Sequence, residues 1–493
     1  MKAIILAGEN DNLKPLTFTK PKPLLPLINK PIIEHIVDYL QSHFVYNIAI
    51  VTNDLREQMM EYFAEKQYVN LSYPEETEPL GSAIPVKYVT YLDETFVVVQ
   101  GDIITDIDLS EIVRLHKKSG GLVTIVLSPV KDTQNLAIAD IEGNGRIIKF
   151  DDKITGESFS NFTNTGIYVI ESEAMDYIPD GHFDFSQDLF SMVIEKGDIS
   201  GYITDGFWVD IRRSKDYVRA TRWMMGHVRN RISSIICGET FENVVLGENV
   251  EVGESIIMGP AVIGDDVIIE DNCFIGPYTC IGDGVCIDEN TEIYSSTLFE
   301  DVSVGKRSRI VGSFVGEYTT IGDGAKINDA TIGGYCKLER SVGIANGSNI
   351  WPFTSLPHSS IVHATIKRFE RASENGGFFR ILSDEEAFYF NMREGRNIVS
   401  TGFVANGIEE FVAILRKVDQ RSIDYHLREN FNDLAQWIRY VFRDEELADE
   451  IEKIDENDKK ARRKLIEKVS SRMMIKHNEA HDKEVIEIES CSA

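Results

Sequence analysis

The sequence predicts an α/β domain, then a parallel β-helix, then a small α-helical domain. Three observations carry this prediction. Short apolar runs alternate with amphipathic stretches up to residue 230, an aliphatic residue recurs at six-residue steps over 244–350, and helical apolar stripes follow. A chain of 493 residues is too long for one ordinary core, so several domains are expected. We place them at 1–230, 240–366 and 368–478, with a flexible tail over 479–493.

The first domain reads as alternating strands and helices. The segments 4–7, 48–52, 96–100 and 122–127 are short apolar runs typical of buried strands, and 32–40 is amphipathic. Such alternation is typical of helices packed on a mostly parallel sheet. Polar residues follow the apolar runs at their carboxyl ends, which is where sheets of this kind bind ligands.

The second domain is predicted from a repeat. Ile263, Ile269, Ile275, Ile281 and Ile287 stand six residues apart, each followed by a small or acidic residue, and the pattern resumes after a slip and continues to residue 350. A period of six with an inward aliphatic residue is the hexapeptide repeat of a β-helix. Stacked coils bury a continuous aliphatic ladder. We expect this domain to be a scaffold that builds oligomers.

Two apolar stripes at helical spacing predict the third domain. One stripe is Ile408, Phe411, Val412, Leu415 and Val418, and the other is Leu434, Trp437, Ile438, Val441 and Phe442. Residues three and four apart share one helix face, so each stripe indicates an amphipathic helix. The last residues are rich in Glu, Lys and Ser, a composition that favours a flexible tail.

Charge and hydropathy exclude several partners. The formal net charge is −29, whereas nucleic-acid binding relies on clustered Lys and Arg. No apolar run approaches the roughly 20 residues that span a bilayer, and the apolar N-terminal run is too short for a signal peptide. We therefore expect a cytoplasmic protein with neither nucleic acid nor membrane as a partner.

The N-terminal segment carries the most specific motif. Residues 6–17 read LAGENDNLKPLT, and residues 21–26 read PKPLLP. The segment resembles the signature LAGGxGTRLxPLTxxxPKPLLP of sugar-1-phosphate nucleotidyltransferases (NDP-sugar pyrophosphorylases), which include mannose-1-phosphate guanylyltransferases and glucose-1-phosphate thymidylyltransferases. The resemblance implies a Rossmann-like nucleotidyltransferase domain, and the repeats resemble the left-handed β-helix often attached to it.

The resemblance also implies an activity and its residues. Enzymes of this family form an NDP-sugar and pyrophosphate from an NTP and a hexose 1-phosphate, with Mg²⁺ or another divalent cation. Lys22 matches the catalytic lysine that meets the α-phosphate, and Asp102 and Asp210 match the two metal-holding aspartates. Divalent Mg²⁺ prefers such carboxylate oxygens. The remaining matches are Leu6, Ala7, Gly8, Pro79, Leu80, Gly81, Ser82 and Gly101 for nucleotide binding, and Asp152, Lys153, Asn164, Thr165 and Gly166 for sugar-phosphate binding.

Two of the sequence's departures from the family bear on the charges around the triphosphate. In residues 9–12, Glu9, Asp11 and Asn12 replace glycine, glycine and threonine, and the segment lacks the family's arginine. Glycines let backbone N–H groups surround a triphosphate, and two carboxylates there repel it. After Asp210 the family's Gly-Thr-Pro turn is replaced by Arg212-Arg213-Ser214. Lys14, Arg212 and Arg213 are the cations that could stand in for the lost arginine.

Two alternatives follow from these departures and from the β-helix. A catalytically impaired homologue would bind an NDP-sugar or sugar phosphate and regulate an active paralogue as a hetero-oligomer. A minor alternative is acyltransferase activity in the β-helix, with His358 or His363 as the base. We favour the enzyme, with an NTP and a sugar 1-phosphate as ligands and a homo-oligomeric assembly.

Overall fold

The computed structural model describes residues 1–7, 13–52, 56–64, 66, 70–74, 83, 86, 89, 92, 94–134, 136–151, 158–178, 183–227, 239–240, 243–345, 347–366, 382, 386–428, 431–455, 458 and 460–490. The chain divides into two compact units, Met1–His227 and Val228–Ala493. Among the helices of these described ranges, none has both the length and the apolar character that crossing a lipid bilayer requires.

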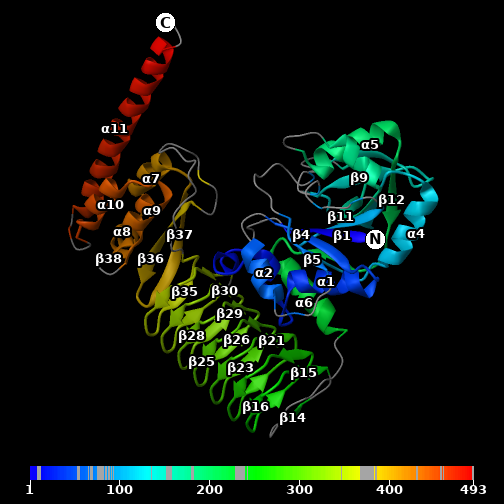
Figure 1. Ribbon diagram of the computed structural model, residues 1–493. Coiled ribbons are helices and arrows are strands. Elements are labelled where there is room, and N and C mark those ends of the chain that lie inside the picture. Colours follow the sequence, from blue (N-terminus) through cyan, green and yellow to red (C-terminus); the bar gives the residue numbers. More distant parts are fainter. Residues whose placement is uncertain are drawn as a thin grey trace. The chain divides into compact units, whose positions relative to one another are not determined.

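A nine-stranded sheet forms the centre of the first unit (Figure 1). Its strands are β1 (Lys2–Leu6), β4 (Asn47–Val51), β5 (Leu71–Ser72), β6 (Phe96–Gln100), β8 (Val123–Pro129), β9 (Ile138–Ile141), β10 (Ile147–Asp151), β11 (Phe162–Ile170) and β12 (Ile199–Ile203). The order is β10-β9-β11-β6-β1-β4-β5, with β8 also paired to β11 and β12 to β8. β1 pairs parallel with both β4 and β6, which confirms the predicted α/β fold.

Helices cover this sheet, and local sequence sets their ends. They are α1 (Ile32–Ser42), α2 (Arg56–Ala64), α4 (Leu109–Ser119), α5 (Phe190–Lys196) and α6 (Ser214–Met225). The Asp108 carboxylate accepts the N–H of Glu111 at the start of α4, and Gly120 ends that helix with a φ of +72°, as N-caps and glycine C-caps do. Ile4, Val98, Ile125 and Phe190 are fully buried between the sheet and the helices.

Two short strand pairs lie beside the main sheet. β2 (Pro26–Leu27) pairs with β3 (Lys30–Pro31), and β7 (Ile103–Thr105) pairs with β13 (Trp208–Asp210). Both pairs are antiparallel. The second pair joins the chain just after β6 to the chain just before α6, so it connects segments far apart in sequence.

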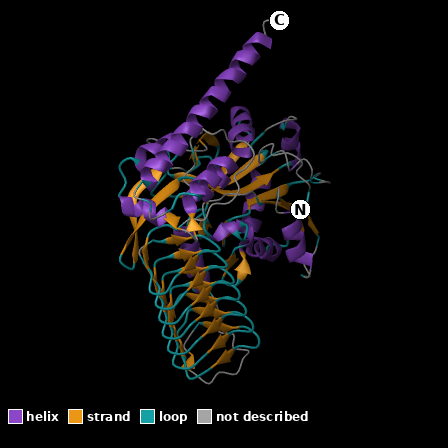
Figure 2. Ribbon diagram, turned by 90° about the vertical axis from the view of Figure 1, so that its left-hand side faces the viewer, coloured by secondary structure: helices purple, strands orange, loops and turns teal. Residues whose placement is uncertain are grey.

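The second unit begins with a β-helix of three parallel sheets, seen as stacked strands in Figure 2. One face holds β14 (Glu239–Thr240), β17 (Ile256–Ile257), β20 (Phe274–Ile275), β23 (Glu292–Tyr294), β26 (Arg309–Val311), β29 (Lys326–Asn328), β32 (Gly343–Ile344) and β35 (Ile361–His363). The next holds β15 (Val244–Leu246), β18 (Ala261–Ile263), β21 (Thr279–Ile281), β24 (Thr297–Leu298), β27 (Phe314–Val315), β30 (Thr331–Ile332) and β33 (Asn349–Ile350). The third holds β16 (Glu251–Val252), β19 (Ile268–Ile269), β22 (Cys286–Ile287), β25 (Ser303–Val304), β28 (Thr320–Ile321), β31 (Lys337–Leu338) and β34 (Ser355–Leu356).

The aliphatic residues of the repeat form the core of the β-helix. Ile275 pairs with Ile257 in one neighbouring coil and with Ile293 in the other, and all three are fully buried. Side chains alternate across a strand, so Ile269 points inward while its neighbour Ile268 stays 38% exposed. The structure therefore confirms the predicted parallel β-helix.

The domain after the β-helix contains the predicted helices, and a β-hairpin precedes them. A hairpin of β36 (Phe388–Glu394) and β37 (Asn397–Ala405) continues the first β-helix face, because β37 pairs parallel with β35. The helices that follow are α7 (Ile408–Leu415), α8 (Gln420–His426), α9 (Asp433–Val441), α10 (Glu445–Glu452) and α11 (Ala461–Ser490). β38 (Leu427–Arg428) and β39 (Phe431–Asn432) form a short pair between α8 and α9. Every residue of both predicted apolar stripes is buried.

The segment predicted as a flexible tail overlaps the last helix, and its flexibility stays a prediction. α11 continues to Ser490 and so covers most of the segment 479–493.

Candidate active site

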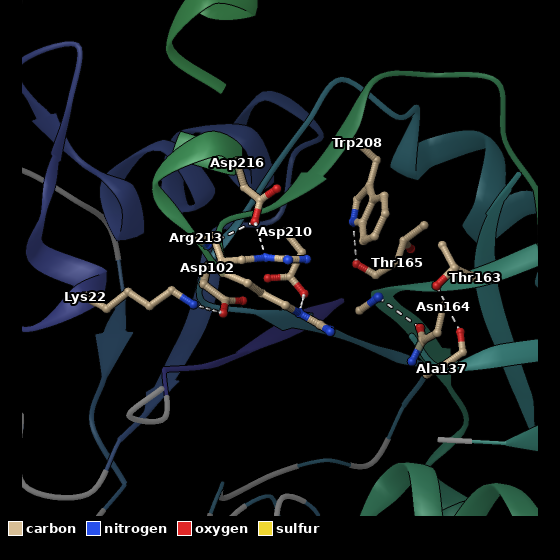
Figure 3. A network of polar contacts seen from close by, with 12 residues as sticks. Lys22, Asp102, Ala137, Thr163, Asn164, Thr165, Trp208, Asp210, Arg213 and Asp216 are labelled. Carbon is tan, nitrogen blue, oxygen red and sulfur yellow. Dashed lines mark hydrogen bonds and ion pairs between the residues drawn. The ribbon is translucent and has the colours of Figure 1, made fainter. Parts of the chain in front are cut away.

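Two ion pairs lie at the carboxyl end of β6 in the first unit. Nζ of Lys22 lies 2.5 Å from Oδ2 of Asp102, and Nε of Arg212 lies 2.5 Å from Oδ2 of Asp210. Figure 3 shows Lys22 pointing toward Asp102, with the Asp210 carboxylate beside it. We call these four side chains the charged quartet. The quartet contains two of the predicted metal ligands and the predicted catalytic lysine.

Strand pairing brings the two aspartates together. Asp102 precedes β7, and Asp210 is the last residue of β13 and pairs with Ile103. The N–H of Ile211 then donates to the Asp102 carbonyl at 2.9 Å. Because an antiparallel ladder fixes which residues are neighbours, the backbone holds the two carboxylates side by side despite their separation in sequence.

Gly101 sets how closely β6 approaches β1 at this point. Its N–H donates to the Leu6 carbonyl at 2.8 Å. A Cβ on Gly101 would lie 2.9 Å from both the Leu6 oxygen and the Ala7 Cα, closer than real Cβ contacts allow. The structure thus brings together Leu6, Ala7 and Gly101, three of the residues predicted to bind nucleotide.

The quartet is unevenly buried. The Lys22 side chain is 3% exposed and that of Asp102 is 21% exposed, whereas Asp210 is 8% and Arg212 37% exposed. Burial raises the pKa of Asp210 to about 6, and the negative charge of Asp102 adds to this rise, while Arg212 and Lys22 oppose it. Asp210 is therefore a carboxylate whose charge depends on the cations placed beside it.

The two carboxylates fit a divalent cation. Oδ1 of Asp210 is buried and makes no hydrogen bond, so this oxygen has an unused lone pair at the site. Within the described residues, no third His, Cys, Asp or Glu joins the pair to form a larger metal cluster. Mg²⁺ is commonly held by one or two carboxylates, with water and substrate phosphate completing its shell.

The predicted sugar side lies on a bulge in β11. Pairing of β11 with β8 shifts register between Asn164 and Tyr168, and Gly166 adopts a φ of +79° there, which glycine accepts without strain. The Gly166 N–H donates to Oδ1 of Asn164 at 2.9 Å. Indole Nε1 of Trp208 donates to the Thr165 carbonyl at 2.7 Å, as Figure 3 shows. Trp208 therefore connects the bulge to the strand that carries Asp210.

Several predicted residues lie outside the described part of the chain. These are Gly8, Pro79, Leu80, Gly81, Ser82, Asp152 and Lys153, together with the divergent residues 9–12. Their predicted roles in nucleotide and sugar-phosphate binding stay predictions.

Sequence reasoning named Arg212 as a substitute for the family's lost arginine and not as the partner of Asp210, and it gave Trp208 no role in the site. The signal for Arg212 was its place in the segment where the family has Gly-Thr-Pro. Arg213, which shares that segment, is 66% exposed with its Nε 4.0 Å from Asp216, so it lies apart from the quartet's ion pairs. The signal for Trp208 was its spacing two residues before Asp210.

The two histidines considered for acyl transfer lie in the last coils. His358 is exposed, and its Nε2 is 3.1 Å from Oγ of Ser359. His363 is exposed at the end of β35. Neither position supports one reaction over another, and the acyltransferase alternative stays a prediction.

Two family models match this chain. The model described as "Nucleotidyl transferase" matches residues 2–225, which include the whole charged quartet. The model described as "GMPPB C-terminal domain" matches residues 257–367, which cover most of the β-helix.

Individual proteins also match this chain. A UTP–glucose-1-phosphate uridylyltransferase from Synechocystis is 34% identical over 247 residues, 46% of this chain and 63% of that relative. A mannose-1-phosphate guanyltransferase from Aspergillus oryzae is 30% identical over 246 residues, 48% of this chain and 67% of that relative. The solved structure of HddC from Yersinia pseudotuberculosis complexed with GMP-PN is 21% identical, with a TM-score of 0.40 over 45% of this chain and 99% of that one.

The match to the uridylyltransferase spans less than two thirds of that relative's length, whereas the match to the guanyltransferase passes that share. The nucleotidyl transferase model covers the sheet, Lys22 and both aspartates. This chain therefore belongs to the family of sugar-1-phosphate nucleotidyltransferases.

Proposed function

We propose that the protein transfers a nucleotidyl group from an NTP to a hexose 1-phosphate, with a divalent cation such as Mg²⁺. A phosphate oxygen of the sugar phosphate attacks the α-phosphorus, the α–β phosphoanhydride bond breaks, and pyrophosphate leaves. The products are an NDP-sugar and pyrophosphate. The attacking oxygen is already anionic, so no general base is needed.

The observation that carries this proposal is the charged quartet. Two carboxylates and two cations lie at the carboxyl end of β6, where ligands bind to sheets of this class. We assign Asp102 and Asp210 to hold the divalent cation, which when bound would stabilise negative charge on the phosphates. Lys22 is nearly fully buried, so its ammonium is held in a fixed position for the α-phosphate. Preorganised charges of this kind are the main source of catalysis in phosphoryl chemistry.

The bulge on β11 supports a place for the sugar. Asn164 and Gly166 hold one another, and Trp208 fixes Thr165 from the β13 side. A segment braced in this way keeps its geometry when the ligand enters, which lowers the entropy cost of binding. We assign the hexose 1-phosphate to this side of the quartet.

A regulatory homologue is the second candidate, and one observation favours it. Arg212 already neutralises Asp210, so the carboxylate does not require a metal to be paired. In that case the site would bind an NDP-sugar without turning it over, and the β-helix would join this chain to an active paralogue. Under the first candidate we propose that the β-helix supports a homo-oligomer.

A pyrophosphate-release assay separates the two. The full chain is incubated with Mg²⁺, each of several NTPs and each of several hexose 1-phosphates, and binding of NTPs and NDP-sugars is measured by calorimetry. The enzyme releases pyrophosphate, and Asp102→Asn and Asp210→Asn abolish this release. Binding of an NDP-sugar without NTP binding or turnover would establish the regulatory homologue instead.

A further inference from the structure

Gln100, the last residue of β6, lies between two parts of the site. On one side it pairs with Leu6 of β1. On the other side β6 and β11 pair antiparallel at Val99 and Ile167, so the next position along the same ladder brings Gln100 opposite Gly166. Gln100 therefore separates the predicted nucleotide residues of β1 from the predicted sugar residues of the β11 bulge.

The side chain of Gln100 lies over Gly166. A Cβ on Gly166 would stand 2.9 Å from Cγ, 2.8 Å from Cδ and 2.7 Å from Oε1 of Gln100, closer than real Cβ contacts allow. Gly166 also has a φ of +79°, which glycine adopts readily because it has no Cβ. The missing side chain at Gly166 thus leaves the space that the Gln100 carboxamide occupies, on the sugar side of β6.

The polar side chains of the bulge already have partners within the protein. Oδ1 of Asn164 accepts the Gly166 N–H, and its Nδ2 donates to the Tyr168 hydroxyl at 2.8 Å. The Thr165 hydroxyl donates to the Val126 carbonyl at 2.9 Å. These bonds fix the shape of the bulge, so Asn164 and Thr165 serve mainly as its internal supports.

The carboxamide of Gln100 differs from these side chains. In the part of the chain that the structure describes, it makes no hydrogen bond, and the residue is half-buried. An amide side chain carries two N–H donors and one carbonyl acceptor, so it can bind a hydroxyl group in either direction. Ligands bind at the carboxyl ends of the strands in sheets of this class. The Gln100 carboxamide is therefore suited to a ligand that carries hydroxyl groups.

We propose that Gln100 determines which hexose the site accepts, by a hydrogen bond between its carboxamide and a ring hydroxyl of the hexose 1-phosphate. The inference rests on the proposed function and adds a specificity residue to its sugar side. A half-buried amide that meets no hydroxyl keeps polar groups without a partner, which is costly. The site should therefore reject a hexose in which this hydroxyl is absent or points to the other face of the ring.

The proposal is tested with Gln100→Met in the full chain, because methionine keeps the length of the side chain and removes its amide. Calorimetry, with Mg²⁺ and a non-hydrolysable NTP analogue present, first selects the tightest binder among glucose, mannose and galactose 1-phosphates. It then compares that sugar phosphate with analogues that each lack one ring hydroxyl. The wild-type chain should bind one analogue about tenfold more weakly than the parent, as expected for one hydrogen bond. Gln100→Met should bind this analogue and the parent equally.

Gln187→Met is the matched control, since Gln187 is exposed in the same unit, and it should keep the wild-type preference. Binding of the NTP analogue alone should be unchanged in both variants. Thermal unfolding shows whether each variant folds, and Gln100→Leu replaces Gln100→Met if the latter does not.

Two results would overturn the assignment of Gln100 while leaving the proposed function intact. One is that the Gln100 variant keeps the wild-type preference among the analogues, or that the wild-type chain has no such preference. The other is that the variant weakens binding of the NTP analogue and not of the sugar phosphate. If the wild-type chain binds none of the three hexose 1-phosphates and releases no pyrophosphate with them, the proposed function itself is wrong.

Discussion

The backbone N–H of Ile211 lies 2.9 Å from the carbonyl oxygen of Asp102, and this bond fixes the spacing of the two aspartates in the site. It continues the β7–β13 ladder by one residue beyond the Asp210–Ile103 pair. The carboxylates are thus positioned by main-chain bonds, which side-chain substitution leaves intact. Asp102→Asn and Asp210→Asn should accordingly change the chemistry of the site without changing its backbone.

Replacing Gly101 by alanine should damage both stability and activity. The new Cβ would lie 2.9 Å from backbone atoms of Leu6 and Ala7, and overpacking of this kind costs about 1–3 kcal/mol. Denaturant unfolding and pyrophosphate release measure the two effects. Gly143→Ala is the matched control, because a Cβ there meets nothing within 4 Å. Equal stability of the two variants would contradict the close approach of β1 and β6.

Trp208→Phe should weaken binding of the sugar phosphate. The substitution leaves the buried Thr165 carbonyl without the indole donor, a loss of about 1–3 kcal/mol, and loosens the bulge at Gly166. The KM for hexose 1-phosphate should rise more than the KM for the NTP in steady-state kinetics. Trp223→Phe keeps an aromatic ring stacked on Phe207 and should leave both values unchanged. A rise confined to the NTP would place Trp208 on the other side of the site.

The first unit should lose stability in mild acid. Burial lowers the pKa of His35 and of His116 from the ordinary 6.5, and in His116 this outweighs the opposing charge of Glu171. Below pH 6.5 the unfolded chain takes up protons at these histidines that the folded chain excludes. The stability that the two histidines contribute is therefore fully present above pH 6.5 and falls as the pH drops through it, while the raised pKa of Asp210 acts in the opposite direction. Urea unfolding at several pH values measures this slope. His116→Gln should flatten the slope, and an unaltered slope in that variant would remove His116 as its source.

Truncation of adjacent residues in the β-helix should lower stability by very different amounts. Ile269→Ala removes a buried member of the aliphatic ladder and should cost about 2–5 kcal/mol. Ile268→Ala, one residue away and 38% exposed, should cost far less. Thermal unfolding of the full chain, followed by circular dichroism, compares the two. Similar losses at both positions would contradict the inward-outward alternation of β19.

The parts of the protein that could be predicted from the sequence are those with a periodic pattern or a specific motif. The six-residue period located the inward residues of the β-helix, such as Ile275 and Ile293, because each coil repeats one pattern. Family resemblance selected Lys22, Asp102 and Asp210, and the structure brings these three together. The helical stripes of the last domain were also located correctly, because a helix with one buried face has apolar residues three and four positions apart.

What the sequence did not predict depends on contacts between distant segments. The ion pair of Arg212 with Asp210 depends on the turn after β13, which the family's Gly-Thr-Pro pattern does not describe. The sequence analysis did not predict the hairpin of β36 and β37. The pairing of β37 with β35, a strand from an earlier segment of the chain, stabilises this hairpin as part of a sheet. Local propensity alone does not contain such information.

The most direct test of the proposed nucleotidyl transfer follows a radioactive label on the α-phosphate of the NTP. The full chain is incubated with an α-³²P-labelled NTP, a hexose 1-phosphate and Mg²⁺, and the products are separated by chromatography. Label should move into an NDP-sugar, and Asp210→Asn should abolish this transfer. The proposed transfer is wrong if the label stays in the NTP for every combination of base and sugar while an unlabelled NDP-sugar still binds the protein.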